Sequence, residues 1–177
     1  MVASIHEGPR VFGIIGRSGA GKTTLIEALL PVLATRGVSV STLKHAHAGF
    51  DLDRPGKDSA RHRAAGAREV MLVGDVRWAL LAEATPPGLD ALIARMAPVD
   101  LVLVEGFRDL PIPKLEVWRT GLAEPPWASA GFAVLGLVGN AHPATTVPTL
   151  DPADLGAIAD LVMAHAAQLL PGTNGTD

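Results

Sequence analysis

The 177-residue chain contains no cysteine and no tyrosine, and aromatic side chains make up only 4% of it. The absence of cysteine excludes disulfides, thiolate metal centres, iron–sulfur clusters and a cysteine nucleophile. Four Phe and three Trp are too few for a surface that stacks nucleic-acid bases. The net charge of −3 also argues against a nucleic-acid binder, whose field would be basic.

Long apolar runs are absent as well. No uninterrupted stretch approaches the roughly 20 residues of a membrane-spanning helix, and residues 1–10 lack the apolar centre of a signal peptide. We therefore expect a cytoplasmic protein with no membrane partner. With 48% hydrophobic residues, the chain is apolar enough to fold around a core. We expect one domain over residues 1–170 and a flexible tail over residues 171–177.

Short apolar runs alternate with helical patterns along the chain. Runs of apolar or β-branched residues predict strands, and apolar residues repeated every three or four positions predict helices. Their alternation predicts an α/β fold in three layers, with a mostly parallel sheet and helices on both faces. The expected strands are 11–15, 38–43, 70–73, 78–82, 99–104, 115–118 and 132–138, and the expected helices are 24–36, 58–65, 89–96 and 152–170.

The most specific local pattern is a glycine-rich loop between the first expected strand and the first expected helix. Glycines let backbone N–H groups converge into an anion-binding nest at a helix N-terminus. Lys22 is expected to neutralise the β- and γ-phosphates of a nucleotide, Thr23 to ligate Mg²⁺ and Thr24 to contact the α-phosphate. The loop matches G-x-x-x-x-G-K-[ST] in full, with Gly16, Arg17, Ser18, Gly19, Ala20, Gly21, Lys22 and Thr23. The expected fold class is therefore that of the P-loop NTPases.

A carboxylate for the metal ion is expected at the end of the most apolar strand. Residues 99–104 are followed by Glu105, and in open α/β sheets ligands bind outside the carboxyl ends of the strands. We therefore predict that Glu105 holds Mg²⁺ with Thr23, directly or through water. Asp100 lies near the start of the same strand, about 17 Å away at ~3.4 Å per residue, and is a poor candidate ligand.

Positive charge is concentrated in residues 44–68. This segment carries six basic and three acidic side chains, a net charge of +3, which leaves −6 for the rest of the chain. Concentrated cations suit a polyanionic ligand. Lys57, Arg61 and Arg63 are predicted to contact phosphates of the nucleotide or of a second phosphorylated ligand. The alternative is a solvated basic helix.

The same segment contains His45, His47 and His62. Two histidines separated by one residue, with a third further along the chain, can form a zinc site. The neighbouring cations oppose a metal ion, and hydrogen bonding to phosphate or carboxylate is the favoured alternative. The pattern leaves open whether these histidines bind a metal, a phosphate or neither.

Five stretches of the chain form a combined pattern: 16–24, 44–47 (KHAH), 50–59 (FDLDRPGKDS), 61–67 (RHRAAGA) and 103–107 (LVEGF). Together they resemble the molybdopterin-guanine dinucleotide biosynthesis protein B (MobB) family, in the family's order. The resemblance runs from about residue 11 to residue 169, and its specific part is the segment after residue 44. It implies a homodimeric, GTP-binding P-loop protein with slow GTPase activity. It also implies two partners: molybdopterin or its molybdenum-bound form, and the guanylyltransferase that attaches GMP to it.

The chain departs from the family's pattern at two places. Ala46-His47-Ala48 stands where the family often has Thr-His-His, which weakens a histidine metal site. Asn140 stands where a base-reading Asp is often found. Asn140 is still expected to hydrogen-bond the base, but an amide cannot accept from both N1–H and the amino group of guanine. The sequence therefore leaves the choice between GTP and ATP open.

Catalysis is expected to rest on positioning, with Lys22 and Mg²⁺ stabilising the phosphates. Asp53 is the predicted water-orienting residue, and Arg17 is a candidate for reaching across a dimer. Two alternative functions remain. One is a small-molecule kinase that uses Asp51 or Asp53 as base. The other is an adaptor in which the nucleotide orders the segment after Lys44 and hydrolysis is incidental.

Overall fold

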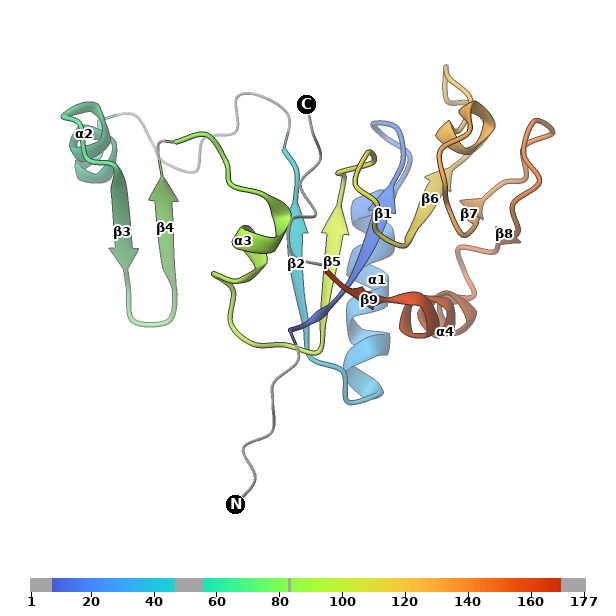
Figure 1. The fold of residues 1–177 in the computed structure, drawn as a ribbon, viewed down its shortest axis with the longest axis horizontal. Coiled ribbons are helices and arrows are strands. Elements are labelled where there is room, and N and C mark those ends of the chain that lie inside the picture. The colour runs from blue at the N-terminus through green and yellow to red at the C-terminus, as the bar shows by residue number, and fades with distance from the viewer. Residues whose placement is uncertain (1–7, 47–55, 83, 170–177) are drawn as a thin grey trace. The chain divides into compact units, whose positions relative to one another are not determined.

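The computed structural model describes residues 8–46, 56–82 and 84–169 (Figure 1). The chain divides into two compact units, Met1–His45 with Gly88–Asp177 and, separately, Ala46–Pro87. The expectation of one domain over residues 1–170 stays a prediction, and the expected tail 171–177 lies outside the described residues.

The larger unit is built on a mostly parallel sheet with the strand order β2-β5-β1-β6-β7-β8. The short strand β9 pairs antiparallel with the start of β1. Glu105 is the register partner of both Ile14 and Lys44, so the carboxyl ends of β1, β2 and β5 meet at one edge. The strands are β1 (Arg10–Ile15), β2 (Val40–Lys44), β5 (Leu101–Glu105), β6 (Lys114–Trp118), β7 (Leu137–Gly139), β8 (Thr149–Leu150) and β9 (Ala167–Gln168).

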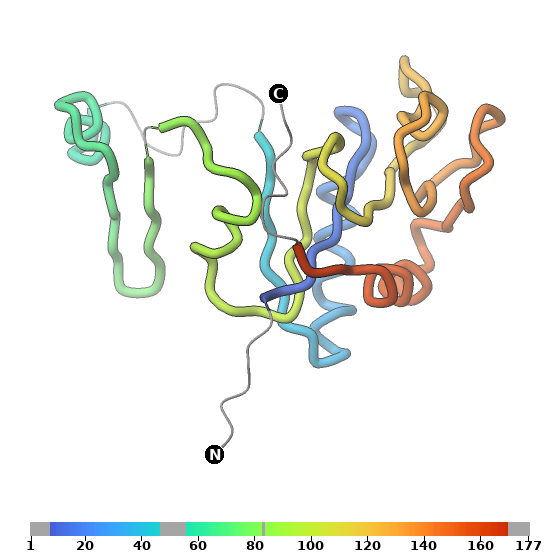
Figure 2. The backbone as a smooth tube through the Cα atoms, viewed as in Figure 1, coloured from blue at the N-terminus to red at the C-terminus, as the bar shows by residue number. Residues whose placement is uncertain are grey.

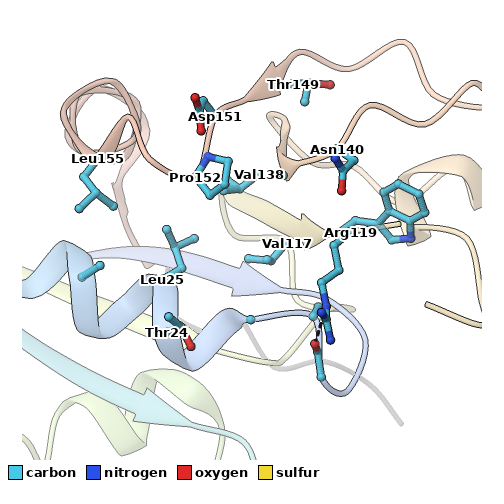
Figure 3. A pocket seen from close by; sticks show the side chains of 16 residues that line it. Thr24, Leu25, Val117, Arg119, Val138, Asn140, Thr149, Asp151, Pro152 and Leu155 are labelled. Carbon is cyan, nitrogen blue, oxygen red and sulfur yellow. Dashed lines mark hydrogen bonds between the residues drawn. The ribbon is translucent and has the colours of Figure 1, made fainter. Parts of the chain in front are cut away.

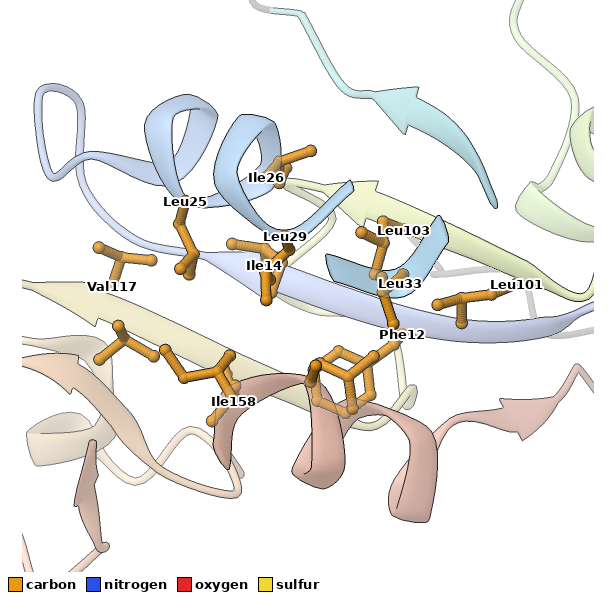
Figure 4. Packing of buried hydrophobic residues seen from close by; sticks show 14 of the residues in the cluster. Phe12, Ile14, Leu25, Ile26, Leu29, Leu33, Leu101, Leu103, Val117 and Ile158 are labelled. Carbon is orange, nitrogen blue, oxygen red and sulfur yellow. The ribbon is translucent and has the colours of Figure 1, made fainter. Parts of the chain in front are cut away.

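Helices cover both faces of this sheet. Because successive side chains of a strand point to opposite faces, Phe12 and Ile14 of β1 pack with α1 (Lys22–Thr35) and α4 (Leu155–His165), as Figure 4 shows. Val11 faces the other way and packs with α3 (Leu89–Ile93). The three-layer α/β fold of the P-loop NTPase type is thereby confirmed.

The smaller unit consists of α2 (Asp58–Ala64) and a hairpin of β3 (Glu69–Val73) and β4 (Trp78–Ala82). The hairpin strands are antiparallel and pair from Glu69 with Ala82 to Val73 with Trp78. Figure 2 traces both strands and the turn between them in green. Both strands and the helix lie where the sequence predicts them.

The main differences from the predicted elements lie in the C-terminal part. The strand expected at 132–138 is confined to β7, and the helix expected at 152–170 is confined to α4. Asp154 caps α4 by accepting a hydrogen bond from the amide of Ala157 at 2.9 Å, so Pro152 stays outside the helix. Beyond Ala166 the backbone is extended and continues into β9. The strand β8 and the 3₁₀ helix η1 (Trp127–Ala130) were not predicted.

Asp100 joins the starts of β2 and β5. Its Oδ2 accepts hydrogen bonds from the Ser39 hydroxyl at 2.5 Å and the Ser39 amide at 2.8 Å. These bonds lower the pKa of the Asp100 carboxyl below its usual range. A carboxyl whose pKa is lowered by folding stabilises the fold above its unfolded pKa of about 3.9, and this contribution disappears as the pH falls through the folded pKa.

We therefore expect Asp100→Asn to lower the free energy of unfolding at pH 7 and to lower it less at about pH 3. Urea denaturation of both proteins at the two pH values measures the difference. An equal loss at both pH values would contradict the assigned role of the Asp100 carboxylate.

Candidate functional site

The loop between β1 and α1 has a backbone conformation that requires glycine. Gly16 has a φ of 143°, and a Cβ there would lie 2.4 Å from the carbonyl oxygen of Val117. Gly21 has a φ of 108° and forms the N-cap of α1, where no side chain caps the helix and the first turn holds no acidic residue. The first amides of a helix have no acceptor within the helix. This helix start is therefore built to receive an anion.

Lys22 folds back over the same loop. Its Nζ donates hydrogen bonds to the carbonyl oxygens of Gly16 at 2.8 Å and Arg17 at 3.0 Å. Burial lowers the pKa of the Lys22 ammonium; the Glu105 carboxylate opposes this shift and Lys44 adds to it. The lysine thus places a half-buried positive charge beside the free helix amides, where a phosphate group would meet both.

The predicted metal ligands lie together at the carboxyl ends of β1 and β5. The Thr23 hydroxyl lies 3.3 and 3.4 Å from the two carboxylate oxygens of Glu105. The Nζ of Lys44 lies 3.1 Å from Glu105 Oε1 and 3.5 Å from Thr23 Oγ1. A hydroxyl and a carboxylate are oxygen ligands of the kind that Mg²⁺ takes alongside phosphate and water. The residues present therefore fit this metal ion.

A cavity of ≈ 910 Å³ opens beside the phosphate loop (Figure 3). Its walls are the start of α1, the carboxyl ends of β6, β7 and β8, and the start of α4. The predicted residues Thr24 and Asn140 both line it, with Arg119 and Asp151. Its volume lies within the range of small-molecule sites. The loop and the cavity together form one continuous candidate site for a phosphorylated ligand.

The loop and its flanking strands match a known family. Residues 11–139 match the family described as Molybdopterin guanine dinucleotide synthesis protein B. The chain belongs to this family. It is 45% identical over 118 residues to the "Molybdopterin-guanine dinucleotide biosynthesis adapter protein" of Haemophilus influenzae, a match that covers 65% of this chain and 66% of that one.

Two further relatives agree. An Escherichia coli protein of the same description is 37% identical over 153 residues, covering 82% of this chain and 87% of its own. The crystal structure of Bacillus subtilis MobB has a TM-score of 0.68 to this chain at 26% identity, covering 90% of this chain and 99% of that one. The recognition of the MobB family from its sequence motifs and the α/β fold are thus confirmed.

In this MobB-family chain, the side chain of Arg17 is held by contacts with a neighbouring segment. Its Nη1 lies 2.6 Å from Glu124 Oε2, and its guanidinium lies over the ring of Trp127 at 4.6 Å from the centroid. The other loop positions have simpler surroundings: Ser18 is exposed at the tip, and Ala20 is buried with its amide 3.2 Å from the carbonyl oxygen of Arg17.

Glu116 anchors the segment that holds Arg17. It is fully buried on β6, and its two oxygens accept hydrogen bonds from the amides of Trp127 at 2.7 Å and Ala128 at 2.9 Å. Burial raises the pKa of the Glu116 carboxyl, and these hydrogen bonds and the nearby Arg17 oppose the shift. Glu116 was not among the residues predicted from the sequence, although a single carboxylate inside the strand Lys114–Trp118 was a usable signal.

Some predicted residues lie in the smaller unit or outside the described residues. Lys57 precedes α2, and Arg61 and Arg63 lie on it, in the smaller unit. Asp53 and His47 lie outside the described residues. Their proposed contacts with phosphate, water or metal stay predictions.

The structure describes two histidines of the basic segment, His45 and His62. The ring of His45 packs against Phe107 with centroids 4.6 Å apart, and His62 lies on α2 in the other unit. Across residues 8–46, 56–82 and 84–169, no group of three His, Asp or Glu side chains could hold a metal ion. A metal at Thr23 and Glu105 would therefore take its remaining ligands from nucleotide and water.

Proposed function

We propose that this protein binds Mg–GTP, hydrolyses it slowly, and serves as an accessory protein of molybdopterin-guanine dinucleotide biosynthesis. The observation that carries the proposal is the uncapped helix start with Lys22, beside both an oxygen pair suited to Mg²⁺ and a nucleoside-sized cavity. Membership of the MobB family and the descriptions of its relatives as biosynthesis adapter proteins support the biosynthetic role.

The parts of a nucleotide fit the parts of the site. The triphosphate would lie on the amides of residues 16–24 with Lys22 alongside. The ribose and base would enter the cavity between α1, β6 and β7. Thr23 and Glu105 would hold Mg²⁺, whose chemistry is to neutralise charge that develops on the phosphates.

Slow hydrolysis follows from the charged groups at the phosphate end of the site. Lys22 and Lys44 supply positive charge there, which stabilises a transition state by electrostatics and positioning. The carboxylate beside them, Glu105, is committed to the metal. Asp53 stays the proposed water-orienting residue. With Asp53 as the single proposed water-orienting residue and no arginine finger proposed, the GTPase is expected to turn over slowly.

A second copy of the chain is the proposed partner of the β3–β4 hairpin. The cross-strand pairs Met71–Leu80 and Val73–Trp78 put four large apolar side chains on one face. The exposed fraction is 58% for Met71, 40% for Leu80, 76% for Val73 and 65% for Trp78. A cluster of exposed apolar side chains marks an interaction surface, and the homodimer that the sequence resemblance implies would cover it.

The remaining partners are proposed from the chemistry of α2. Arg61 is 75% exposed, and its contact with Asp58 is a long 3.7 Å, so its charge is available to a phosphorylated ligand. We assign Lys57, Arg61 and Arg63 to the phosphate of molybdopterin or its molybdenum-bound form, delivered to the guanylyltransferase.

The described residues contain no helix long and apolar enough to cross a bilayer. The cytoplasm is the proposed location.

Replacing Lys22 tests nucleotide binding. We expect Lys22→Ala to weaken Mg–GTP binding at least about tenfold, because the charge beside the phosphates is lost. Isothermal titration calorimetry measures the affinity, and the melting temperature checks the fold. Arg36→Ala is the control, since Arg36 pairs with Asp160 near the opposite end of α1. An unchanged Kd for Lys22→Ala would contradict the proposal, and a phosphorylated metabolite product would favour the kinase alternative.

Placing a charge on the hairpin tests the dimer. We expect Val73→Glu to shift the protein from dimer to monomer, because a buried, unpaired carboxylate is costly at an apolar interface. Sedimentation velocity measures the distribution. Ala79→Glu adds the same charge to the opposite face of the hairpin, where Ala79 pairs with Leu72, and is expected to leave the dimer intact. A monomeric wild type, or a Val73→Glu dimer, would rule out this interface.

A further inference from the structure

Two polar side chains follow the ends of neighbouring strands at the cavity wall. β7 and β8 are parallel, with Val138 opposite Leu150, and Asn140 and Asp151 come directly after them. Both line the cavity beside the phosphate loop, and Figure 3 shows them on adjoining parts of its wall. If a nucleotide occupies this site as proposed, these side chains are placed to contact its base.

The side-chain oxygen of Asn140, Oδ1, already accepts hydrogen bonds within the protein. It accepts hydrogen bonds from the Thr120 amide at 3.0 Å and the Thr120 hydroxyl at 3.3 Å. A backbone amide only donates, so the oxygen of Asn140, and not its NH₂ group, must face Thr120. Both lone pairs of that oxygen are occupied. What Asn140 offers to a base is therefore its NH₂ group, a donor, which suits acceptors of either purine.

The Asp151 carboxylate supplies the acceptor that Asn140 cannot. Its Oδ1 accepts a hydrogen bond from the Ala153 amide at 2.8 Å, an Asx turn that holds the side chain in place. Across the described residues, no hydrogen bond occupies its second oxygen, Oδ2. The carboxylate therefore keeps open acceptor sites at the cavity wall, with a full negative charge to strengthen any bond made there.

The choice between purines follows from their hydrogen-bonding edges. Guanine presents two adjacent donors, N1–H and the 2-amino group, and a carboxylate accepts from both. Adenine presents an acceptor at N1, which a carboxylate repels. A site that hydrogen-bonds one ligand rejects the analogue that leaves its polar groups unpaired.

We propose that Asp151 is the residue that selects guanine, with Asn140 contributing only a donor. This inference rests on the proposed function, because it needs the nucleotide base in the cavity. It resolves the GTP-or-ATP question that Asn140 alone leaves open, and it makes residues after β8 part of the nucleotide site.

Exchanging the carboxylate for an amide tests the inference. We compare wild type with Asp151→Asn for binding of GTP, ATP and xanthosine triphosphate with Mg²⁺ by calorimetry. Xanthine carries a carbonyl where guanine carries its 2-amino group, so the new NH₂ group should favour it. Asn also forms Asx turns, so the bond to Ala153 and the fold should survive. Asp154→Asn is the matched control, because Asp154 caps α4.

We expect Asp151→Asn to change the affinities for GTP and xanthosine triphosphate in opposite directions. Wild type should prefer GTP to the other two ligands by at least about tenfold. Asp151→Asn should lose at least about tenfold in GTP affinity and gain in xanthosine triphosphate affinity, while Asp154→Asn should keep the wild-type preference.

Three outcomes would overturn the assignment of Asp151 while leaving nucleotide binding intact. These are equal wild-type affinities for GTP and ATP, an unchanged preference in Asp151→Asn, and equal losses for all three ligands, which would mark Asp151 as a purely structural residue. A wild type that binds no nucleotide would instead overturn the proposed function itself, and the inference with it.

Discussion

The uncapped start of α1 is the constraint on which the rest of the site depends. A helix of 14 residues begins at Lys22 with no side-chain cap, so the amides of its first turn need a partner from outside the helix. Gly16 and Gly21 hold the loop in backbone conformations that other residues rarely adopt, and an added Cβ at Gly16 would collide with β6. The unpaired amides and the unusual backbone conformation are unfavourable in free energy, and a bound anion would offset this.

The parallel sheet then determines which side chains surround that helix start. Parallel strands end at the same edge, so residues separated widely in sequence meet there. Glu105 is the last residue of β5 and Lys44 is the last residue of β2, on the side of the proposed metal ligands. Asn140 and Asp151 follow β7 and β8, on the side of the cavity. The strand order therefore separates the proposed phosphate and metal side of the site from its proposed base side.

Features that depend on local sequence patterns were predictable: an uninterrupted motif, and a residue at the carboxyl end of an apolar strand. The phosphate loop is one uninterrupted motif, and Glu105 was identified from the end of an apolar strand; the structure brings it beside Thr23. Features created by tertiary contacts were not predictable in this way. Asp151 follows a strand of two residues, too short to give a periodic signal. Glu116 acquires its role only because the segment at Trp127 folds back onto β6.

We propose above all that the loop at Lys22 receives the triphosphate of a nucleotide whose base enters the adjoining cavity. A crystal structure of the protein grown with Mg²⁺ and a non-hydrolysable GTP analogue tests this proposal most directly. We expect phosphates on the amides of residues 16–24, a metal ion beside Thr23 and Glu105, and guanine between Asn140 and Asp151. An ordered loop that holds only water at saturating analogue, or an analogue bound elsewhere on the protein, would contradict it.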